Sequence, residues 1–177
     1  RSEETLWRDV VQKSPTNGRA LMNDGLTRMA QGKYAEARGL FEHARLHTPN
    51  YASLETNLGI VNGQLGAPVA AEQHFQRALQ LQPDFVGGHY FYARWLVDQG
   101  RAREAIPHLQ RATALSPGFP ASRTLLMQLY FVQNAPAALT ALIRETLRLA
   151  PADPSALAYA QDEMATAAHP ASAQEYY

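Results

Sequence analysis

Small and bulky apolar residues recur along this 177-residue chain with a period of 34 residues. One small column reads Gly25, Gly59, Ala93, Met127, and a second reads Ala37, Ala71, Ala105, Leu139. A bulky column, four positions after the second, reads Trp7, Phe41, Phe75, Leu109, Ile143, and a further small one reads Val10, Ala44, Ala78, Ala112, Thr146. Small residues let two antiparallel helices approach closely, and a bulky residue four positions later fills the gap on the same helical face. The pattern therefore predicts a series of antiparallel helix pairs.

Glycine and proline punctuate the same period and predict where each helix ends. Gly32, Gly66, Gly100 and Asn134 are placed to end the first helix of each pair, and Pro15, Pro49, Pro83, Pro117 and Pro151 to end the second. Ten helices follow: a lone helix at 3–13, pairs at 19–31 with 34–47, 52–65 with 69–81, 86–99 with 102–115 and 121–133 with 137–149, and a closing helix from about Pro154. Asp153 is expected to cap the closing helix, and Pro107 to remove one hydrogen bond from its helix and bend it.

The stretch Thr56-Asn57-Leu58-Gly59, followed by Ala71, Phe75, Ala78 and Pro83, resembles the tetratricopeptide repeat family, whose unit is a 34-residue helix-turn-helix. The resemblance implies an all-α fold, a right-handed superhelix or α-solenoid of such repeats. It divides the chain into a half repeat (1–17), four units (18–51, 52–85, 86–119, 120–153), a closing helix (154–168) and a frayed tail (169–177). Glu55, His89 and Arg123 depart from the family by standing where it usually has tryptophan. Asp24 and Arg28, four apart in a seam that is otherwise apolar, are expected to pair.

In the family that the chain resembles, the first helices line a concave groove that binds extended peptides or helices. The resemblance therefore predicts a protein- or peptide-binding scaffold. Helical spacing selects the groove residues as Arg19, Met22, Asn23, Leu26, Thr56, Asn57, Ile60, Tyr90, Phe91, Arg94, Asp98 and Gln128. Asn23 and Asn57 occupy equivalent places, where related superhelical proteins hold a peptide backbone through the asparagine amide. Met22, Met29 and Phe131 have an alternative interpretation, as core residues of imperfect repeats.

Charge narrows the class of partner. The 16 cations and 16 anions cancel, so no global field draws in nucleic acid, and none is expected as a partner. The net charge is nevertheless uneven, at +2, −2, +4 and −4 over residues 1–50, 51–100, 101–150 and 151–177. Neighbouring solvated faces often differ in this way. The alternative is that the acidic closing segment pairs with a basic surface of a second copy, giving a homodimer through the end helices.

No pattern predicts catalysis, a metal site or a cofactor. His43 and His47 have a spacing at which two imidazoles on a helix can share a metal, but no catalytic glutamate lies between them. The chain has no cysteine, phosphate-binding loop or nucleophile elbow. We therefore expect a recognition module and not an enzyme.

The N-terminal segment offers a second functional hypothesis. It resembles a segment of polytopic membrane proteins related to O-mannosyltransferases, in which a membrane-spanning part is followed by tetratricopeptide repeats outside the cytoplasm. The residues that carry this resemblance are Leu6-Trp7, Ser14-Pro15, Asn17 and Arg19-Ala20. That resemblance implies an extracytoplasmic accessory domain of a membrane glycosyltransferase-like protein, although the aromatic column explains Trp7 equally well. No signal peptide is recognised, and polar residues interrupt the uncharged stretch 124–143, so no membrane insertion by this chain is expected. The localisation stays open.

Overall fold

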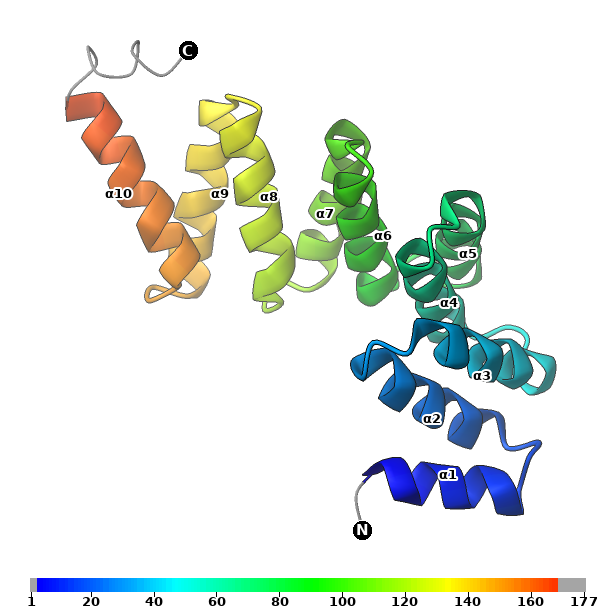
Figure 1. Ribbon diagram of the computed structural model, residues 1–177. Coiled ribbons are helices and arrows are strands. Elements are labelled where there is room, and N and C mark those ends of the chain that lie inside the picture. Colours follow the sequence, from blue (N-terminus) through cyan, green and yellow to red (C-terminus); the bar gives the residue numbers. More distant parts are fainter. Residues whose placement is uncertain (1–2, 169–177) are drawn as a thin grey trace. The chain divides into compact units, whose positions relative to one another are not determined.

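The computed structural model describes residues 3–168, with side chains described over residues 5–162. This part of the chain forms ten α-helices and no strand (Figure 1). The helices are α1 (Glu3–Lys13), α2 (Gly18–Ala30), α3 (Tyr34–His47), α4 (Ala52–Gln64), α5 (Pro68–Leu81), α6 (Val86–Asp98), α7 (Ala102–Leu115), α8 (Pro120–Val132), α9 (Pro136–Leu149) and α10 (Pro154–Ala168). The predicted helices are confirmed, with bounds within one residue of those that the 34-residue period indicated. The tail expected from residue 169 lies outside the described residues.

The predicted punctuation has a clear backbone basis. Gly32, Gly66 and Gly100 follow the first helices at φ values of 74°, 71° and 74°, a left-handed conformation that glycine adopts without steric cost. Asn134 takes the same place after α8 at φ 50°. At the start of α10 the Asp153 Oδ1 atom accepts a hydrogen bond of 2.9 Å from the Ala156 amide, which confirms the expected cap. Helix α7 continues without a break across Pro107, and the bend expected there stays a prediction.

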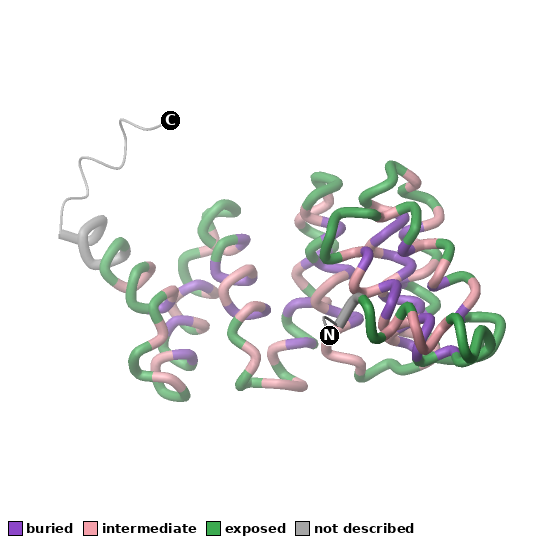
Figure 2. Tube along the Cα trace, turned by 60° about the horizontal axis from the view of Figure 1, so that its bottom comes forward, coloured by how far each residue is buried: buried purple, intermediate pink, exposed green. Residues whose placement is uncertain are grey.

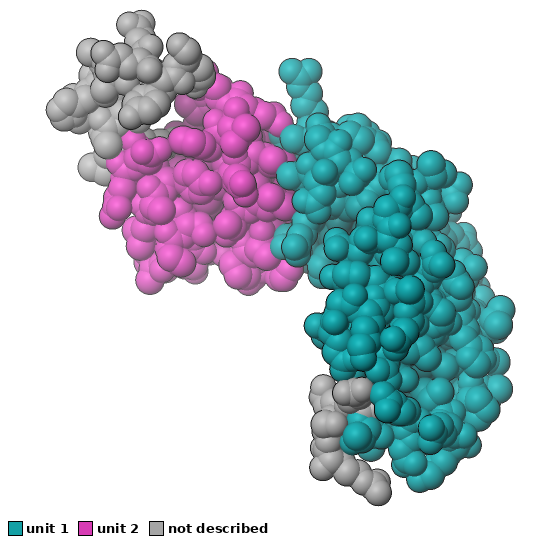
Figure 3. Space-filling model, viewed as in Figure 1, with its two compact units in different colours: residues 1–108 teal, residues 109–177 magenta. Residues whose placement is uncertain are grey.

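The chain divides into two compact units, residues 1–108 and residues 109–177 (Figure 3). The division falls within α7. In the first unit the second helices α3 and α5 each contact their own first helix and the next one: α3 packs on α2 and α4, and α5 packs on α4 and α6. In the second unit α9 packs on α8, and α10 contacts both. Each unit is therefore a stack of antiparallel helices. None of the helices in residues 3–168 has the length and apolar character needed to cross a membrane.

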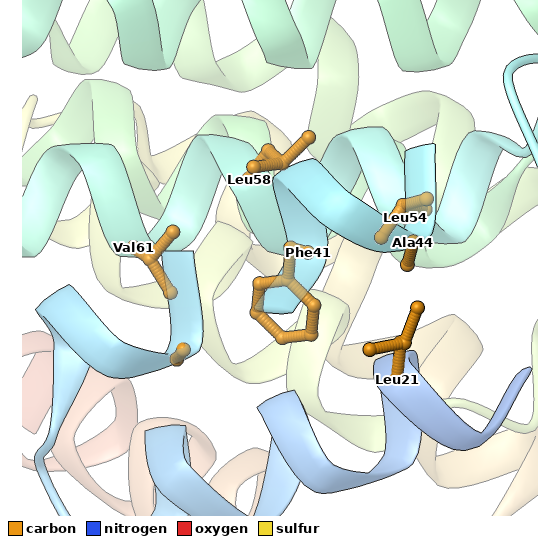
Figure 4. Close-up of a cluster of buried hydrophobic side chains, with 7 residues drawn as sticks. Leu21, Phe41, Ala44, Leu54, Leu58 and Val61 are labelled. Carbon is orange, nitrogen blue, oxygen red and sulfur yellow. The ribbon is translucent and has the colours of Figure 1, made fainter. Parts of the chain in front are cut away.

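The core of the first unit is built from the predicted columns. Its central cluster contains Leu21, Ala37, Phe41, Ala44, Leu54, Leu58 and Val61 from α2, α3 and α4, each at most 1% exposed (Figure 4). Figure 2 shows that buried and exposed segments alternate along helices α2 to α9, whereas no described residue of α1 is buried. Burying one ring such as Phe41 contributes about 1.5–3 kcal/mol to folding.

The two helices of a pair approach closely where a glycine on the first helix lies against an aromatic ring on the second. A Cβ atom at Gly25 would lie 2.5 Å from the Phe41 ring, and one at Gly59 would lie 2.8 Å from the Phe75 ring. Such distances are shorter than any normal carbon contact. The small columns are therefore required by packing. In the second unit Met127, Leu139 and Ile143 join Ala156 in the buried cluster, so larger side chains fill the space there.

We expect Gly25→Ala and Gly39→Ala to change stability in opposite directions. Both glycines are helical, and alanine is intrinsically better in a helix by about 1 kcal/mol. At Gly39 a Cβ meets nothing within 4 Å, so Gly39→Ala should raise the free energy of unfolding by up to that amount. At Gly25 the fully buried Phe41 ring must shift, so Gly25→Ala should lower it by about 1–3 kcal/mol. Urea unfolding followed by circular dichroism measures both changes. Equal midpoints for the two variants would show that helix contact does not depend on the missing Cβ.

Candidate functional site

In the first unit the first helices of successive pairs are neighbours, since α4 contacts both α2 and α6. Side chains 34 residues apart therefore fall into columns that cross these helices. Three columns carry most of the predicted groove residues: Met22, Thr56 and Tyr90; Asn23, Asn57 and Phe91; Leu26, Ile60 and Arg94. We call these residues, with Arg19 and Asp98, the first-helix surface.

The structure gives these side chains different degrees of exposure. Arg19, Arg94 and Asp98 are exposed, whereas Met22, Asn23, Leu26, Asn57, Ile60, Tyr90 and Phe91 are half-buried. Gln128 is exposed on α8, but it belongs to the second unit. The residues available to a ligand in the first unit thus combine amides, apolar groups, aromatic rings and a few charges.

Thr56 is the predicted surface residue that the structure contradicts. It is only 2% exposed, and its hydroxyl donates a hydrogen bond of 3.1 Å to the Ala52 carbonyl one turn earlier in α4. A short side chain bonded back to its own helix cannot reach a ligand. The expectation that Thr56 lies on the exposed surface is therefore wrong, and Thr56 is not counted in the first-helix surface below.

The alternative interpretation of the methionines holds in part. Met22, Leu26 and Met29 are half-buried and pack against the central cluster of the first unit. Phe131, by contrast, is 52% exposed on α8, where its ring centroid lies 5.6 Å from that of Tyr159. Met22 and Leu26 therefore contribute to the core and to the surface at once. For Met22 the unbranched, flexible side chain makes this dual role easy.

A cavity of about 420 Å³ lies at one end of this surface. It is lined by Gly18, Arg19 and Met22 of α2 and by Thr48, Pro49, Asn50 and Tyr51, the loop from α3 to α4. Arg19 and Met22 belong to the predicted set, but the loop residues were missed. Tyr51, which is 45% exposed, follows a helix-ending proline, and sequence patterns for core columns carry no signal for it. The lining offers a thioether, an aromatic ring and a guanidinium, which suits an apolar side chain beside polar backbone groups.

On α6 the first-helix surface contains two aromatic side chains. The Tyr90 and Phe91 rings meet edge to face with centroids 5.1 Å apart, and both are half-buried. Arg94 follows one turn later and is exposed. Rigid rings lose little conformational freedom on binding, so this cluster is suited to contact with a ligand.

A polar column between the first and second helices was also missed. Glu55 of α4 lies against His74 of α5, with 2.7 Å between Glu55 Oε2 and His74 Nδ1. One repeat later His89 of α6 lies against His108 of α7, with 3.0 Å between their Nδ1 atoms. Each pair is separated by 19 residues in sequence. The sequence contained a signal for these pairs. Glu55 and His89 both replace the tryptophan that is usual in the family, and His74 and His108 occupy equivalent positions 34 residues apart.

The histidine pair has one consistent neutral arrangement. His89 Nε2 lies 2.8 Å from the Pro83 carbonyl, which can only accept, so this nitrogen donates. In a neutral ring Nδ1 of His89 then accepts, and Nδ1 of His108 donates to it. Burial, and next the adjacent His89, hold the pKa of His108 below its usual range, against a smaller raising effect of Glu104.

Other charged groups have structural partners. Arg101 donates to both carboxylate oxygens of Glu72 at 2.9 Å, and this bonding lowers the pKa of Glu72. Asp24 and Arg28 pair as expected, at 3.5 Å. Over the described residues no group of three or more histidine or carboxylate side chains is arranged to hold a metal ion. The Arg101–Glu72 pair joins the start of α7 to α5, whereas the Asp24–Arg28 pair lies within α2.

Comparison with known proteins places this geometry in a family. Two family models, both described as tetratricopeptide repeat (TPR), match residues 6–84 and residues 96–162. The chain belongs to the tetratricopeptide repeat family. It is an all-α TPR solenoid, and stacked repeats of this kind serve generally as protein-interaction scaffolds.

Solved TPR structures share this fold at low sequence identity. A thermophilic TPR protein of Thermus thermophilus is similar with a TM-score of 0.73 and 20% identity, over 91% of this chain and 89% of that one. YrrB, whose structure is described as a TPR protein with an unusual peptide-binding site, has a TM-score of 0.66 and 19% identity, over 89% and 81% of the two chains. These likenesses establish the fold.

One curated relative is more similar in sequence. The Vi polysaccharide export protein VexE of Salmonella typhi is 35% identical over 103 residues, which is 56% of this chain. The match covers only 16% of that protein's length.

The histidine pair should make the stability of the TPR array sensitive to pH. Because the folded pKa of His108 is below the ordinary value near 6.5, the unfolded chain binds more protons as the pH falls. The stability that the neutral ring contributes is present above about pH 6.5 and is lost as the pH falls toward the folded pKa. The free energy of unfolding should therefore decrease less between pH 7.5 and 5.5 in His108→Asn than in the wild type. Urea titrations at the two pH values measure this.

The matched control for that experiment is His47→Asn, since His47 is exposed at the end of α3. This variant should keep the pH dependence of the wild type. If His108→Asn and His47→Asn behave alike, the His89–His108 pair does not govern the response.

Proposed function

We propose that this chain is a peptide-binding scaffold and that its ligand lies along the first-helix surface of the first unit. The observation that carries the proposal is the cavity of about 420 Å³ beside Arg19 and Met22, next to a column of half-exposed amide, apolar and aromatic side chains. A cavity of this volume holds one or two side chains. The neighbouring columns supply further contacts along an extended ligand.

The side chains present suit a polypeptide. Asn23 and Asn57 each carry a donor and an acceptor, the pair that a peptide backbone also offers. Met22 and Tyr51 provide an adaptable apolar lining for a side chain, and Tyr90 and Phe91 provide flat apolar faces. A TPR neighbour whose structure is described as having a peptide-binding site adds support at the level of the fold. The proposal is therefore recognition and not catalysis.

The test begins with a peptide selected from a display library against the folded chain. Asn57→Ala combined with Tyr90→Ala should weaken its binding by about 10- to 100-fold, since an amide pair and an aromatic contact each contribute about 1 kcal/mol or more. Fluorescence polarisation gives the affinities. Far-ultraviolet circular dichroism checks that helicity is retained.

A matched control pair lies on the second helices. Gln80→Ala on α5 and Arg103→Ala on α7 change exposed side chains away from the first-helix surface and should bind as the wild type does. Equal affinity of the Asn57→Ala, Tyr90→Ala variant and the wild type would refute the proposed surface.

A second candidate is an accessory role within a larger, envelope-associated protein. The sequence similarity to a polysaccharide export protein, of which the match covers 16%, favours it, together with the N-terminal resemblance to membrane glycosyltransferase-like proteins. In this case the TPR array positions a partner polypeptide for a process carried out by other parts of the assembly.

Photo-crosslinking separates this candidate from the alternatives. A photoreactive phenylalanine analogue in place of Phe91, in the protein expressed in its native cell, should capture a second polypeptide, identified by mass spectrometry. A product of two copies of this chain would indicate the homodimer instead. A product containing glycan without a second polypeptide would exclude polypeptide positioning.

A further inference from the structure

A second cavity, of about 600 Å³, lies beside the same α3–α4 loop. It is lined by the end of α3, the loop, Glu55 of α4 and one face of α5: Arg45, Leu46, Pro49, Asn50, Glu55, Gln73, His74 and Arg77. None of these residues belongs to the first-helix surface. All of them lie in the first unit.

This second cavity has a cationic lining. Within the described residues Arg45 has no hydrogen bond or ion pair, and Arg77 donates only to the Asn50 side chain, at 3.3 Å. The carboxylate in the lining, Glu55, is 3% exposed and already accepts from His74 Nδ1 at 2.7 Å. Two exposed guanidinium groups therefore face the cavity without a carboxylate partner. Planar guanidinium forks of this kind bind carboxylates in bidentate fashion.

The two cavities share part of their lining. Pro49 and Asn50 border both of them, the smaller one with Met22 and Tyr51 and the larger one with Arg45 and Arg77. In an extended peptide, successive side chains point to opposite sides at about 3.3 Å per residue. A peptide that crosses the loop at Pro49 and Asn50 can thus direct an apolar side chain to one cavity and an acidic one to the other.

We propose that the larger cavity binds acidic side chains of a polypeptide, so that the ligand of this scaffold carries aspartate or glutamate next to an apolar anchor. The inference deepens the proposed function and rests on it for the apolar anchor beside Met22. Charge complementarity favours the acidic partner. The contrast between the two adjoining linings favours a polypeptide over an acidic polysaccharide, since a polypeptide places apolar and acidic groups side by side.

The experiment uses a labelled ten-residue peptide of alternating leucine and glutamate, with the leucine and glutamine counterpart as the uncharged probe. Arg45→Gln combined with Arg77→Gln removes both guanidinium groups at exposed positions. The affinity for the acidic peptide should fall about tenfold, and the weak binding of the uncharged peptide should not change. Lys33→Gln combined with Arg103→Gln makes the same change in net charge at exposed positions outside the cavity and should retain the wild-type affinity.

Three results would overturn the inference. One is an unchanged affinity of the Arg45→Gln, Arg77→Gln variant for the acidic peptide. Another is an equal loss in the Lys33→Gln, Arg103→Gln control, which would indicate net charge alone. The third is that an oligogalacturonate binds as tightly as the acidic peptide with the same dependence on Arg45 and Arg77, which would assign the cavity to an acidic polysaccharide.

The Asn57→Ala, Tyr90→Ala variant separates this inference from the proposed function. If it weakens binding of the acidic peptide while the arginine variant does not, the first-helix surface stands and the acidic cavity fails. If the arginine variant alone weakens binding, the acidic cavity stands and the first-helix surface fails.

Discussion

The close approach of two helices over an aromatic ring is the constraint on which the rest of the first unit depends. Gly25 and Gly59 leave no room for a Cβ above Phe41 and Phe75, so each ring touches the backbone of the partner helix. That contact fixes the separation and the register of the pair. In close-packed protein interiors even one added or missing methyl group changes stability. This packing requirement accounts for the small and bulky residues that recur every 34 positions in the first unit.

Because of this packing, the first and second helices have different roles. The second helices α3 and α5 contact first helices on both sides, so their apolar columns are committed to the core. The first helices α2, α4 and α6 keep side chains such as Asn57, Tyr90 and Arg94 that packing does not dictate. The first helices therefore carry both core residues, such as Leu58, and side chains that are left available to a ligand. The polar pairs Glu55–His74 and His89–His108 show that even the interface inside a helix pair accepts polar groups when each finds a partner.

The helices could be predicted almost to the residue because their determinants are local and repeated. The glycines that end first helices, the prolines that follow second helices and the apolar columns all have a fixed spacing in sequence. The surroundings of the candidate site were predicted less completely, since its cavities are lined by residues of more than one element. Thr56 has the right helical phase for exposure but bonds to Ala52 and is buried. Met22 lies on the surface and also packs on the core.

Two further features could not be predicted from the helical periodicity alone. The lining of both cavities comes partly from the α3–α4 loop, whose side chains follow no periodic rule. The pairing of Glu55 with His74 requires knowing which residues of two antiparallel helices lie opposite each other. Both features depend on contacts between residues that are far apart in the sequence, such as the 19 residues between Glu55 and His74. A single sequence indicates such contacts only when the residue columns of different helices are compared with each other.

We propose that the first helices of the first unit recognise a polypeptide ligand. Backbone amide chemical shifts of the isotope-labelled chain, recorded during titration with a peptide selected for binding, test it most directly. If the proposal holds, the largest shift changes fall in α2, α4 and α6 and in the Thr48–Tyr51 loop that borders both cavities. Shift changes confined to α8, α9 and α10, with α2, α4 and α6 unaffected, would contradict it.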